Sequence, residues 1–204
     1  MAELTLTTFL SLDGVMQAPG GPGEDESGGF SHGGWVFPHV DAAFGETITG
    51  IFANADAFLL GRGTYDIFAA YWPRVTDPAD PVATALNSLP KHVASRTRNR
   101  FDWNASQHVG DVVADVPELK ARYPRELQVH GSWGLCQTLI AHDLIDEYRL
   151  LVFPVVLGTG KRLFGSGAVP ATLRLVSSRA TSTGALISVY RRAGSLKTGS
   201  FALD

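Results

Sequence analysis

The sequence predicts an α/β fold with one mainly parallel sheet that ends in an antiparallel hairpin. As far as residue 142, short β-branched and apolar stretches alternate with segments of helical periodicity, which is typical of parallel strands joined by helices. After residue 147 the alternation stops, and two β-rich stretches flank a turn at Gly184. No repeat or domain boundary is evident, so we expect a single domain over residues 1–193 and a flexible polar tail over residues 194–204.

The first half of the chain shows the alternation clearly. The stretch 3–10 is β-branched and apolar and predicts a strand, and a Gly-rich loop follows over residues 17–34. From His39 onward, apolar residues recur at spacings of three and four, which predicts an amphipathic helix. These residues are Val40, Phe44, Ile48, Ile51 and Phe52. A strand over 55–60 and a helix over 64–72 are expected next.

The second half continues the alternation before the hairpin. Asp80-Pro81 suits a helix start, with Asp as N-cap and Pro in the first turn. The stretch from Asp115 to Glu118 resembles a capping box, so another helix is expected to begin there and to end near Tyr123. The remaining expected elements are strands over 91–95, 107–113, 127–130, 147–157, 172–178 and 185–191, and a helix over 135–142.

Composition excludes several functional classes. The 204 residues carry a net charge of −3 without a segment rich in Lys or Arg, which argues against binding to nucleic acid or to a membrane surface. The single cysteine, Cys136, cannot form a disulfide within the chain, and no apolar run approaches the roughly 20 residues that span a bilayer. His32, His39 and His130 lack a metal-ligand spacing, so we expect no metal. Without a signal-peptide pattern, a cytoplasmic protein is expected.

Glycines, hydroxyls and arginines follow the predicted parallel strands. The strand ends carry Ser11–Gly14, Gly61–Thr64, Ser95–Thr97 and Gly131–Gly134. In open α/β sheets, ligands bind beyond these carboxyl ends, where helix N-termini attract phosphate and arginines pair with it. Two phosphate-binding turns on neighbouring strands suit a dinucleotide that carries an extra 2′-phosphate, which favours NADPH over NADH. Each turn alone, Gly61–Thr64 included, is more typical of an ordinary tight turn than of a binding site.

Taken together, these stretches resemble one family. SLDG at 11–14, LLGRGTYDIF at 59–68, KHVASRT at 91–97, VHGSWGLCQTLIAHDLIDE at 129–147 and LLVFPVVLGTGKRLF at 150–164 occur in the order typical of the dihydrofolate reductase-like superfamily. The chain is most similar to the branch with the C-terminal reductase domain of bacterial riboflavin biosynthesis enzymes. The resemblance implies a three-layer α/β domain with a mixed sheet of about eight strands, NADPH as hydride donor and, commonly, a homodimer.

The resemblance also implies roles for individual residues. Gly61, Arg62 and Thr64 match the family's turn that holds cofactor phosphates, and Ser95, Arg96 and Thr97 match the segment at the adenosine 2′-phosphate. The turn at the pyrophosphate is matched by Gly131, Ser132, Trp133, Gly134 and Leu135. Leu157, Gly158 and Gly160 match a loop beside that groove, although a turn after the long strand explains them as well.

The proton donor and the substrate site are less clearly indicated. Reduction needs a proton, commonly from a buried carboxyl with a raised pKa. Asp13, at the end of the first strand, and Asp41, near the start of the first helix, are the candidates, although an Asp-Gly turn and a helix N-terminus explain them too. Trp35 and Trp72 are candidate substrate contacts or core residues. The loop 17–34 is either a lid or a surface loop, and its acidic run 24–26 is expected to be solvated.

The function predicted is therefore an NADPH-dependent reductase that transfers hydride to a small heterocyclic, carbonyl or imine substrate. Riboflavin-pathway reductases act on a phosphorylated ribosyl-pyrimidine, but the sequence shows no extra basic cluster for that phosphate. Neither that substrate nor dihydrofolate is assigned. The alternative is a nucleotide-binding or dimeric structural module that keeps the fold without turnover.

Overall fold

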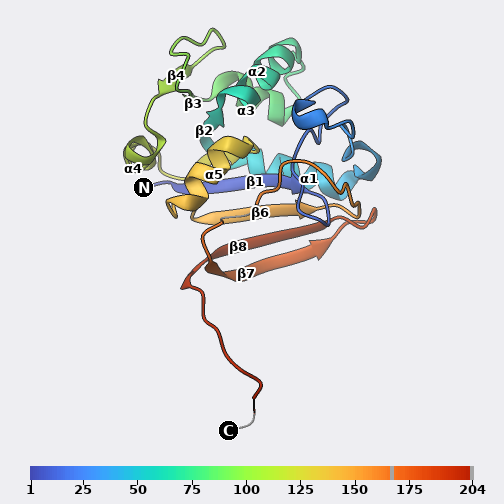
Figure 1. Ribbon diagram of the computed structural model, residues 1–204. Helices are drawn as coiled ribbons and strands as arrows, with labels where there is room; N and C mark the ends of the chain where they lie inside the picture. Colours follow the sequence, from blue (N-terminus) through green and yellow to red (C-terminus); the bar gives the residue numbers. More distant parts are fainter. Residues whose placement is uncertain (166–167, 203–204) are drawn as a thin grey trace.

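The computed structural model describes residues 1–165 and 168–202, and its centre is an eight-stranded sheet (Figure 1). The strand order is β4-β3-β2-β5-β1-β6-β8-β7. The strands are β1 Glu3–Leu10, β2 Ala55–Gly61, β3 Lys91–Ala94, β4 Ser106–Val109, β5 Glu126–His130, β6 Glu147–Val152, β7 Ala171–Ala180 and β8 Leu186–Ser195. The neighbours from β4 to β6 pair in parallel, and β8 and β7 pair antiparallel, so the mixed sheet with a C-terminal hairpin is confirmed.

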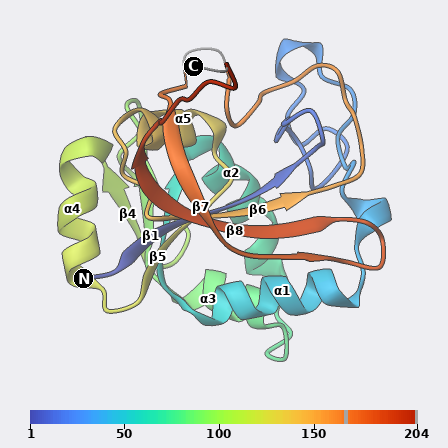
Figure 2. The same cartoon turned by 90° about the horizontal axis from the view of Figure 1, so that it is seen from below.

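Helices cover both faces of the sheet and complete three layers. They are α1 Ala42–Ala53, α2 Arg62–Tyr71, α3 Pro81–Ser88, α4 Val112–Arg122 and α5 Trp133–Ala141, with short 3-10 turns η1 Ser27–Gly29, η2 Phe37–His39 and η3 Trp72–Arg74. The alternation of β2 sends Ala57 and Leu59 toward α4 and α5, and Phe58 and Leu60 toward α1, α2 and α3. On this second face α1 and α3 lie side by side (Figure 2).

Several boundaries differ from the sequence-based expectation, and two of them have a clear physical reason. β4 ends at Val109, and α4 begins at Val112 because the Asp111 carboxylate accepts the N–H groups of Val113 and Ala114. The capping box expected at residue 115 therefore lies inside the first turn of this helix. β6 ends at Val152 rather than at residue 157. Pro154, two residues beyond this end, has no N–H group with which to continue the ladder.

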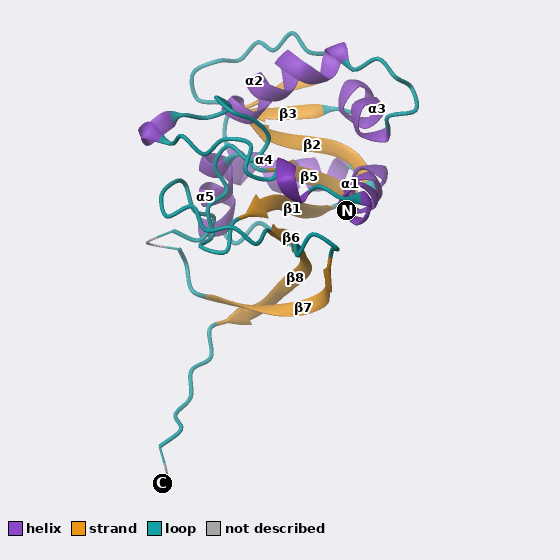
Figure 3. Cartoon of the chain, turned by 90° about the vertical axis from the view of Figure 1, so that its right-hand side faces the viewer, coloured by secondary structure: helices purple, strands orange, loops and turns teal. Residues whose placement is uncertain are grey.

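The C-terminal hairpin forms one edge of the sheet, opposite α2 and α3 (Figure 3). Its β7–β8 ladder shifts register twice, between Ala171 and Leu173 and between Leu175 and Ser177. β8 continues to Ser195, two residues beyond the domain end expected at 193, and residues 196–202 carry no helix or strand. Among the described residues, no helix is long and apolar enough to cross a membrane.

A network of ion pairs crosses the sheet on the α1 side. Arg149 of β6 donates to both carboxylate oxygens of Glu126 on β5, at 2.7 and 2.9 Å, and its Nε donates to Glu147 at 2.8 Å. Arg191 of β8 joins Glu147 at 2.9 Å and Glu3 at 2.8 Å. Arg149, Glu126 and Glu147 are largely shielded from water. The network adds ion pairs to the backbone hydrogen bonds that join the four neighbouring strands β5, β1, β6 and β8.

Replacing Arg149 should therefore be costly. Arg149→Met leaves Glu126 and Glu147 without their shared cation, and we expect a loss of about 3–5 kcal/mol in the free energy of unfolding. The matched control is Arg122→Met, which removes an exposed pair with Glu118 at 3.8 Å and should cost less than about 0.5 kcal/mol. Urea denaturation of both variants measures the difference, and equal losses would contradict a structural role for the network.

Candidate active site

A cavity of about 1320 Å³ opens at the carboxyl ends of the parallel strands. Its walls come from the ends of β1, β2, β3 and β5, the first turns of α2, α4 and α5, one side of α1, and the loop that follows β1. Three strand-end turns named from the sequence meet here. Their lining residues are Gly61, Arg62, Thr64, Ser95, Arg96, Thr97, Gly131, Ser132, Trp133, Gly134 and Leu135. The fold thus brings these separate segments to one place.

Two of the three helices that begin at this cavity, α2 and α5, differ from the other helices at their N-termini. Aspartates cap α1, α3 and α4 through hydrogen bonds to backbone N–H groups. In contrast, no side chain within the described residues caps α2, whose N-cap is Gly61, or α5, whose N-cap is Ser132. The first N–H groups of an uncapped helix need other partners, and an anion is a favourable one. Two such helix starts lining one cavity form an anion-binding wall.

A hydrogen bond joins the two helix starts. Ser132 Oγ accepts from the Gly61 N–H at 2.9 Å, and Gly131 and Ser132 reach this position with φ values of 60° and 66°. A Cβ at residue 61 would lie 3.0 Å from the Ser132 Cβ, so the contact favours glycine there. Since Ser132 Oγ accepts from Gly61, its own hydrogen stays available for a ligand.

The cations of the cavity are not equally available. Arg62 pairs with Asp66 at 3.1 Å, and Lys161 pairs with Asp25 at 2.6 Å. Arg96 is exposed, and within residues 1–165 and 168–202 it forms no ion pair. The Ser95 hydroxyl accepts the Arg98 N–H at 3.0 Å and so shapes the loop that carries Arg96. Arg96 is therefore the cation best placed to pair with a phosphate.

The β1 and α1 side of the cavity has a different character. It is lined by Thr7, Thr8, Phe9, Phe44, Ile48, Phe52 and His130, with Phe68 and Trp72 from the α2–η3 segment. Of the two tryptophans expected at the substrate, Trp72 lines the cavity. Trp35 does not: it is buried, packs edge-on against Phe153 at 5.8 Å, and donates from Nε1 to the Gln17 carbonyl at 2.8 Å.

His130 is held neutral at the floor of this region. Burial, together with the positive charge of Arg149, lowers the pKa of His130 to about 3. The Gln128 side-chain nitrogen already donates to the Ile51 carbonyl and to Glu126, so Gln128 Oε1 accepts from His130 Nε2–H at 3.0 Å. This arrangement selects the tautomer in which Nδ1 is an acceptor. The ring stacks on Phe52 with centroids 4.5 Å apart.

The structure places Asp13 outside the cavity. Its Oδ1 accepts from Ser11 Oγ at 2.6 Å and from the Leu157 N–H at 3.1 Å, while Oδ2 accepts from the Gly158 N–H at 2.9 Å and pairs with Arg162 at 3.2 Å. The Ser11 hydroxyl and these N–H groups hold the pKa of Asp13 well below its usual range. Asp13 is thus an anchor for the loop after β6, and the raised pKa expected for a proton donor is wrong here.

Asp41 also lies away from the cavity. It caps α1 by accepting the Phe44 N–H at 2.8 Å, and it accepts from Ser182 Oγ in the β7–β8 turn at 2.6 Å. The Ser182 hydroxyl and the Phe44 N–H lower the pKa of Asp41 to about 2. A carboxylate held in this state ties α1 to the hairpin, and the expectation of a raised pKa is again wrong.

The loop after β6 does not line the cavity through Leu157, Gly158 or Gly160. These residues contact the segment that follows β1 instead. Leu157 and Gly158 donate to Asp13, and a Cβ at Gly160 would lie 2.7 Å from the Val15 side chain. Gly160 therefore allows the loop after β6 to pack closely on the segment after β1. The loop is therefore better described as a turn after β6 than as part of the cofactor groove.

The loop after β1 forms a wall of the cavity. Gln17 is buried, and its side-chain nitrogen donates to the carbonyls of Asp25 and Ser27 at 3.0 and 2.9 Å. Its Oε1 accepts the Lys161 N–H at 3.1 Å. Residues 16–20, 24, 25 and 27 line the cavity, so this Gly-rich segment is folded against the site.

Glu24 is a carboxylate that sequence reasoning missed. The acidic run was expected to be solvated, but only Glu26 of the three is fully exposed. Glu24 folds back over the Gly-Pro turn, where its Oε2 accepts the N–H groups of Gly20 and Gly21 at 2.6 and 3.0 Å. Burial raises the pKa of Glu24, which lines the cavity. No local pattern signals this, because the burial comes from the path of the loop.

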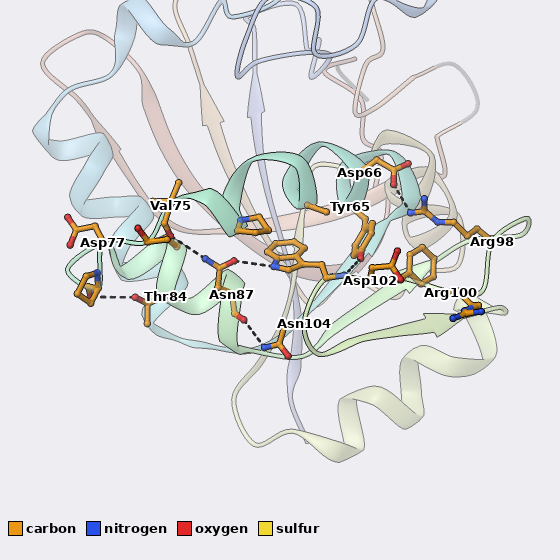
Figure 4. A pocket seen from close by; sticks show the side chains of 17 residues that line it. Tyr65, Asp66, Val75, Asp77, Thr84, Asn87, Arg98, Arg100, Asp102 and Asn104 are labelled. Carbon is orange, nitrogen blue, oxygen red and sulfur yellow. Dashed lines mark hydrogen bonds and ion pairs between the residues drawn. The ribbon is translucent and has the colours of Figure 1, made fainter.

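A second cavity of about 910 Å³ lies among α2, α3 and the loop after β3 (Figure 4). Its polar side chains are largely paired with one another. Asn87 accepts from Trp103 Nε1 at 3.1 Å, the Asn104 amide donates to the Asn87 carbonyl at 3.0 Å, and Asp66 pairs with Arg98 at 2.5 Å. The larger cavity, with its uncapped helix starts, is therefore the better candidate site.

Comparison with known proteins agrees with this geometry. The family model described as the RibD C-terminal domain matches residues 2–187. The chain belongs to this family. RibD C-terminal domains are pyrimidine-reductase-like and share the dihydrofolate reductase-like fold, so membership points to a reductase.

Individual relatives cover nearly the whole chain. The uncharacterized protein YyaP of Bacillus subtilis (strain 168) is 29% identical over 190 residues, which are 92% of this chain and 94% of YyaP. A putative riboflavin biosynthesis protein from Shewanella sp. PV-4 superposes with a TM-score of 0.69 at 23% identity, covering 95% of this chain and 99% of that one. A pyrimidine reductase-like protein from Corynebacterium diphtheriae gives 0.59 at 13% identity, covering 94% and 92%.

A bifunctional relative shows where the match ends. The diaminohydroxyphosphoribosylaminopyrimidine deaminase/5-amino-6-(5-phosphoribosylamino)uracil reductase of Thermotoga maritima superposes with a TM-score of 0.61 at 12% identity. The match covers 94% of this chain but 57% of that protein. At this identity the likeness concerns the fold.

The titration order of the three acids is directly measurable. By carbon-detected NMR titration of carboxyl groups, Glu24 should titrate above 4.5 and both Asp13 and Asp41 below 3.8. Because its folded-state pKa is lowered, Asp13 stabilises the fold above pH 3.8, and this contribution is lost as the pH falls through that pKa. Asp13→Asn should therefore be destabilising at pH 7 and nearly neutral in acid. A Glu24 that titrates below 4.5 would contradict its burial in the cavity wall.

Proposed function

We propose that this protein is an NADPH-dependent reductase that transfers hydride to a small ring compound with a C=O or C=N bond. One observation carries the proposal. The uncapped starts of α2 and α5 and the loop bearing Arg96 follow adjacent strands β2, β5 and β3, and all three line a single cavity. Membership of the RibD C-terminal domain family supports reduction as the reaction.

The donor set fits a phosphorylated dinucleotide. The free N–H groups at the starts of α2 and α5, with the hydroxyls of Thr64 and Ser132, suit the two charges of a pyrophosphate. Arg96 and Thr97 lie on the next strand end, where a 2′-phosphate would meet the Arg96 guanidinium, which forms no ion pair with the residues that the structure describes. Bound NADPH would supply the hydride, and the protein's part is to hold it and to exclude water.

Glu24 replaces the two aspartates as the candidate proton donor. Its Oε2 is engaged by two backbone N–H groups, so Oε1 is the atom left to hold the proton. Burial keeps this acid protonated to higher pH than an ordinary glutamate, which suits a general acid. Lys161 pairs with the neighbouring Asp25 instead, so it does not neutralise Glu24 through a direct ion pair.

The cofactor assignment is testable by ligand-induced stabilisation. NADPH should raise the melting temperature more than NADH does, because binding to the folded state stabilises by mass action. Arg96→Ala should weaken NADPH binding by about 10- to 100-fold and leave NADH unchanged, since it removes a charge-assisted contact to the 2′-phosphate.

Two control variants show whether the effect is specific to Arg96. Arg100→Ala, in the same loop but lining the second cavity, should leave both nucleotides unaffected, and Arg62→Ala should have less effect than Arg96→Ala because Arg62 already pairs with Asp66. If neither nucleotide changes the melting temperature, the reductase proposal fails. If NADPH binds but no carbonyl or imine is reduced, the non-catalytic nucleotide-binding alternative gains support.

The homodimer implied by the resemblance stays a prediction. The β7–β8 hairpin exposes large apolar side chains, among them Leu175, Val176 and Leu186, and a second copy could bury apolar side chains of this kind. Light scattering should give twice the chain mass, and Val176→Lys should reduce it. A monomeric mass at micromolar concentration would contradict the prediction.

A further inference from the structure

We propose that the substrate of this site is an uncharged flat ring compound without a phosphate group, bound at the α1 end of the cavity between aromatic side chains. This inference rests on the proposed function, because it takes the strand-end turns as the place of the cofactor. It concerns the remaining part of the same cavity.

The position follows from the order of the strands. Phosphates at the ends of β3, β2 and β5 place the nucleotide on one side of the cavity. The cavity continues past β5 to β1 and α1, where Phe9, Phe44 and Phe52 form its wall. A hydride acceptor must lie beside the reactive ring of the cofactor, so this remaining end is the place for the second reactant.

The walls at this end are apolar and aromatic. Phe9 and Phe44 lie with centroids 5.5 Å apart, and Phe52 stacks on His130 at 4.5 Å. Ile48 from α1, together with Phe68 and Trp72 from the α2–η3 segment, completes the enclosure. Aromatic faces bind flat rings through stacking and edge contacts, and concave apolar walls are typical of small-molecule sites.

Positive charge is confined to the other end. Among the described residues that line the cavity, the cationic side chains are Arg62, Arg96 and Lys161. Arg62 and Arg96 follow the phosphate-facing strands, and Lys161 is paired with Asp25. His130 does not supply a charge, since burial and Arg149 lower its pKa to about 3. A phosphate or carboxylate at the α1 end would lose its hydration without gaining a cation, which is costly.

One polar group at the floor of this end suits a neutral polar edge. His130 offers Nδ1 as an acceptor, because its Nε2–H is directed to Gln128. An acceptor nitrogen at this position matches a neutral ring compound that carries an N–H group.

Two ligands that cannot be reduced at this site test the preference of the α1 end for an uncharged ring compound. Naphthalene-2-carboxamide and naphthalene-2-carboxylate share one ring system and differ in charge. With NADP⁺ saturating the phosphate end, calorimetric titration of the full chain should show the carboxamide binding at least about tenfold more tightly than the carboxylate. Equal binding, or tighter binding of the carboxylate, would overturn the inference.

A charge introduced at the α1 end should reverse this preference. Ile48→Arg places a guanidinium among the lining residues, so the carboxylate should become the tighter probe. Thr49→Arg adds the same charge on an exposed position of the same helix and should leave the preference unchanged. If Ile48→Arg does not fold, Phe44→Arg serves instead, because Phe44 lines the same end of the cavity from α1 and is only partly buried.

The two proposals fail in different ways. Absence of NADP⁺ binding would remove the proposed function, and it would be seen before any probe is added. Normal NADP⁺ binding with no binding of the carboxamide would remove this inference and leave the cofactor assignment intact. An unchanged probe preference in Ile48→Arg, or in Phe44→Arg if that variant is used, would equally overturn it.

Discussion

The hydrogen bond from the Gly61 N–H to Ser132 Oγ is the contact on which the candidate site depends. It joins the turn after β2 to the turn after β5, and so places the starts of α2 and α5 side by side. Both partners are specialised for it: Gly61 leaves room, and Ser132 adopts a left-handed conformation. With its hydroxyl used in this way, Ser132 does not cap its own helix, and the N–H groups stay available for an anion.

The sequence predicted the parts of the structure that local patterns control. The strand at residues 3–10, the turns at Gly61 and Gly131 and the helix that follows Asp80 all depend on neighbours within a few positions, and they lie where expected. The roles of Asp13 and Asp41 depend on Gly158 and Ser182, more than 130 residues away, so local chemistry suggested acids where the fold needs anchors. Glu24 was missed for a similar reason, because the path of the loop after β1 buries an acid that appears solvated in the sequence.

Charge separates the two ends of the cavity more clearly than shape does. Backbone N–H groups and Arg96 form one end, whereas aromatic rings from β1, α1 and α2 form the other. The ionic network of Arg149 lies just beneath the second end and reaches it through Gln128 and His130. This chain of hydrogen bonds links a sheet-stabilising ion pair to the protonation state of a cavity residue.

The register shift between Leu175 and Ser177 leaves one extra residue on β7, and this has a consequence for how chains can associate. β7 is the last strand of the sheet, and an outer strand with regular N–H and C=O groups invites another strand to add to it. An extra residue in the outer strand interrupts that regular spacing and increases the local twist, so this edge is a poor template for continued sheet growth. The molecule can therefore expose apolar side chains on its hairpin and still resist open-ended polymerisation through its backbone.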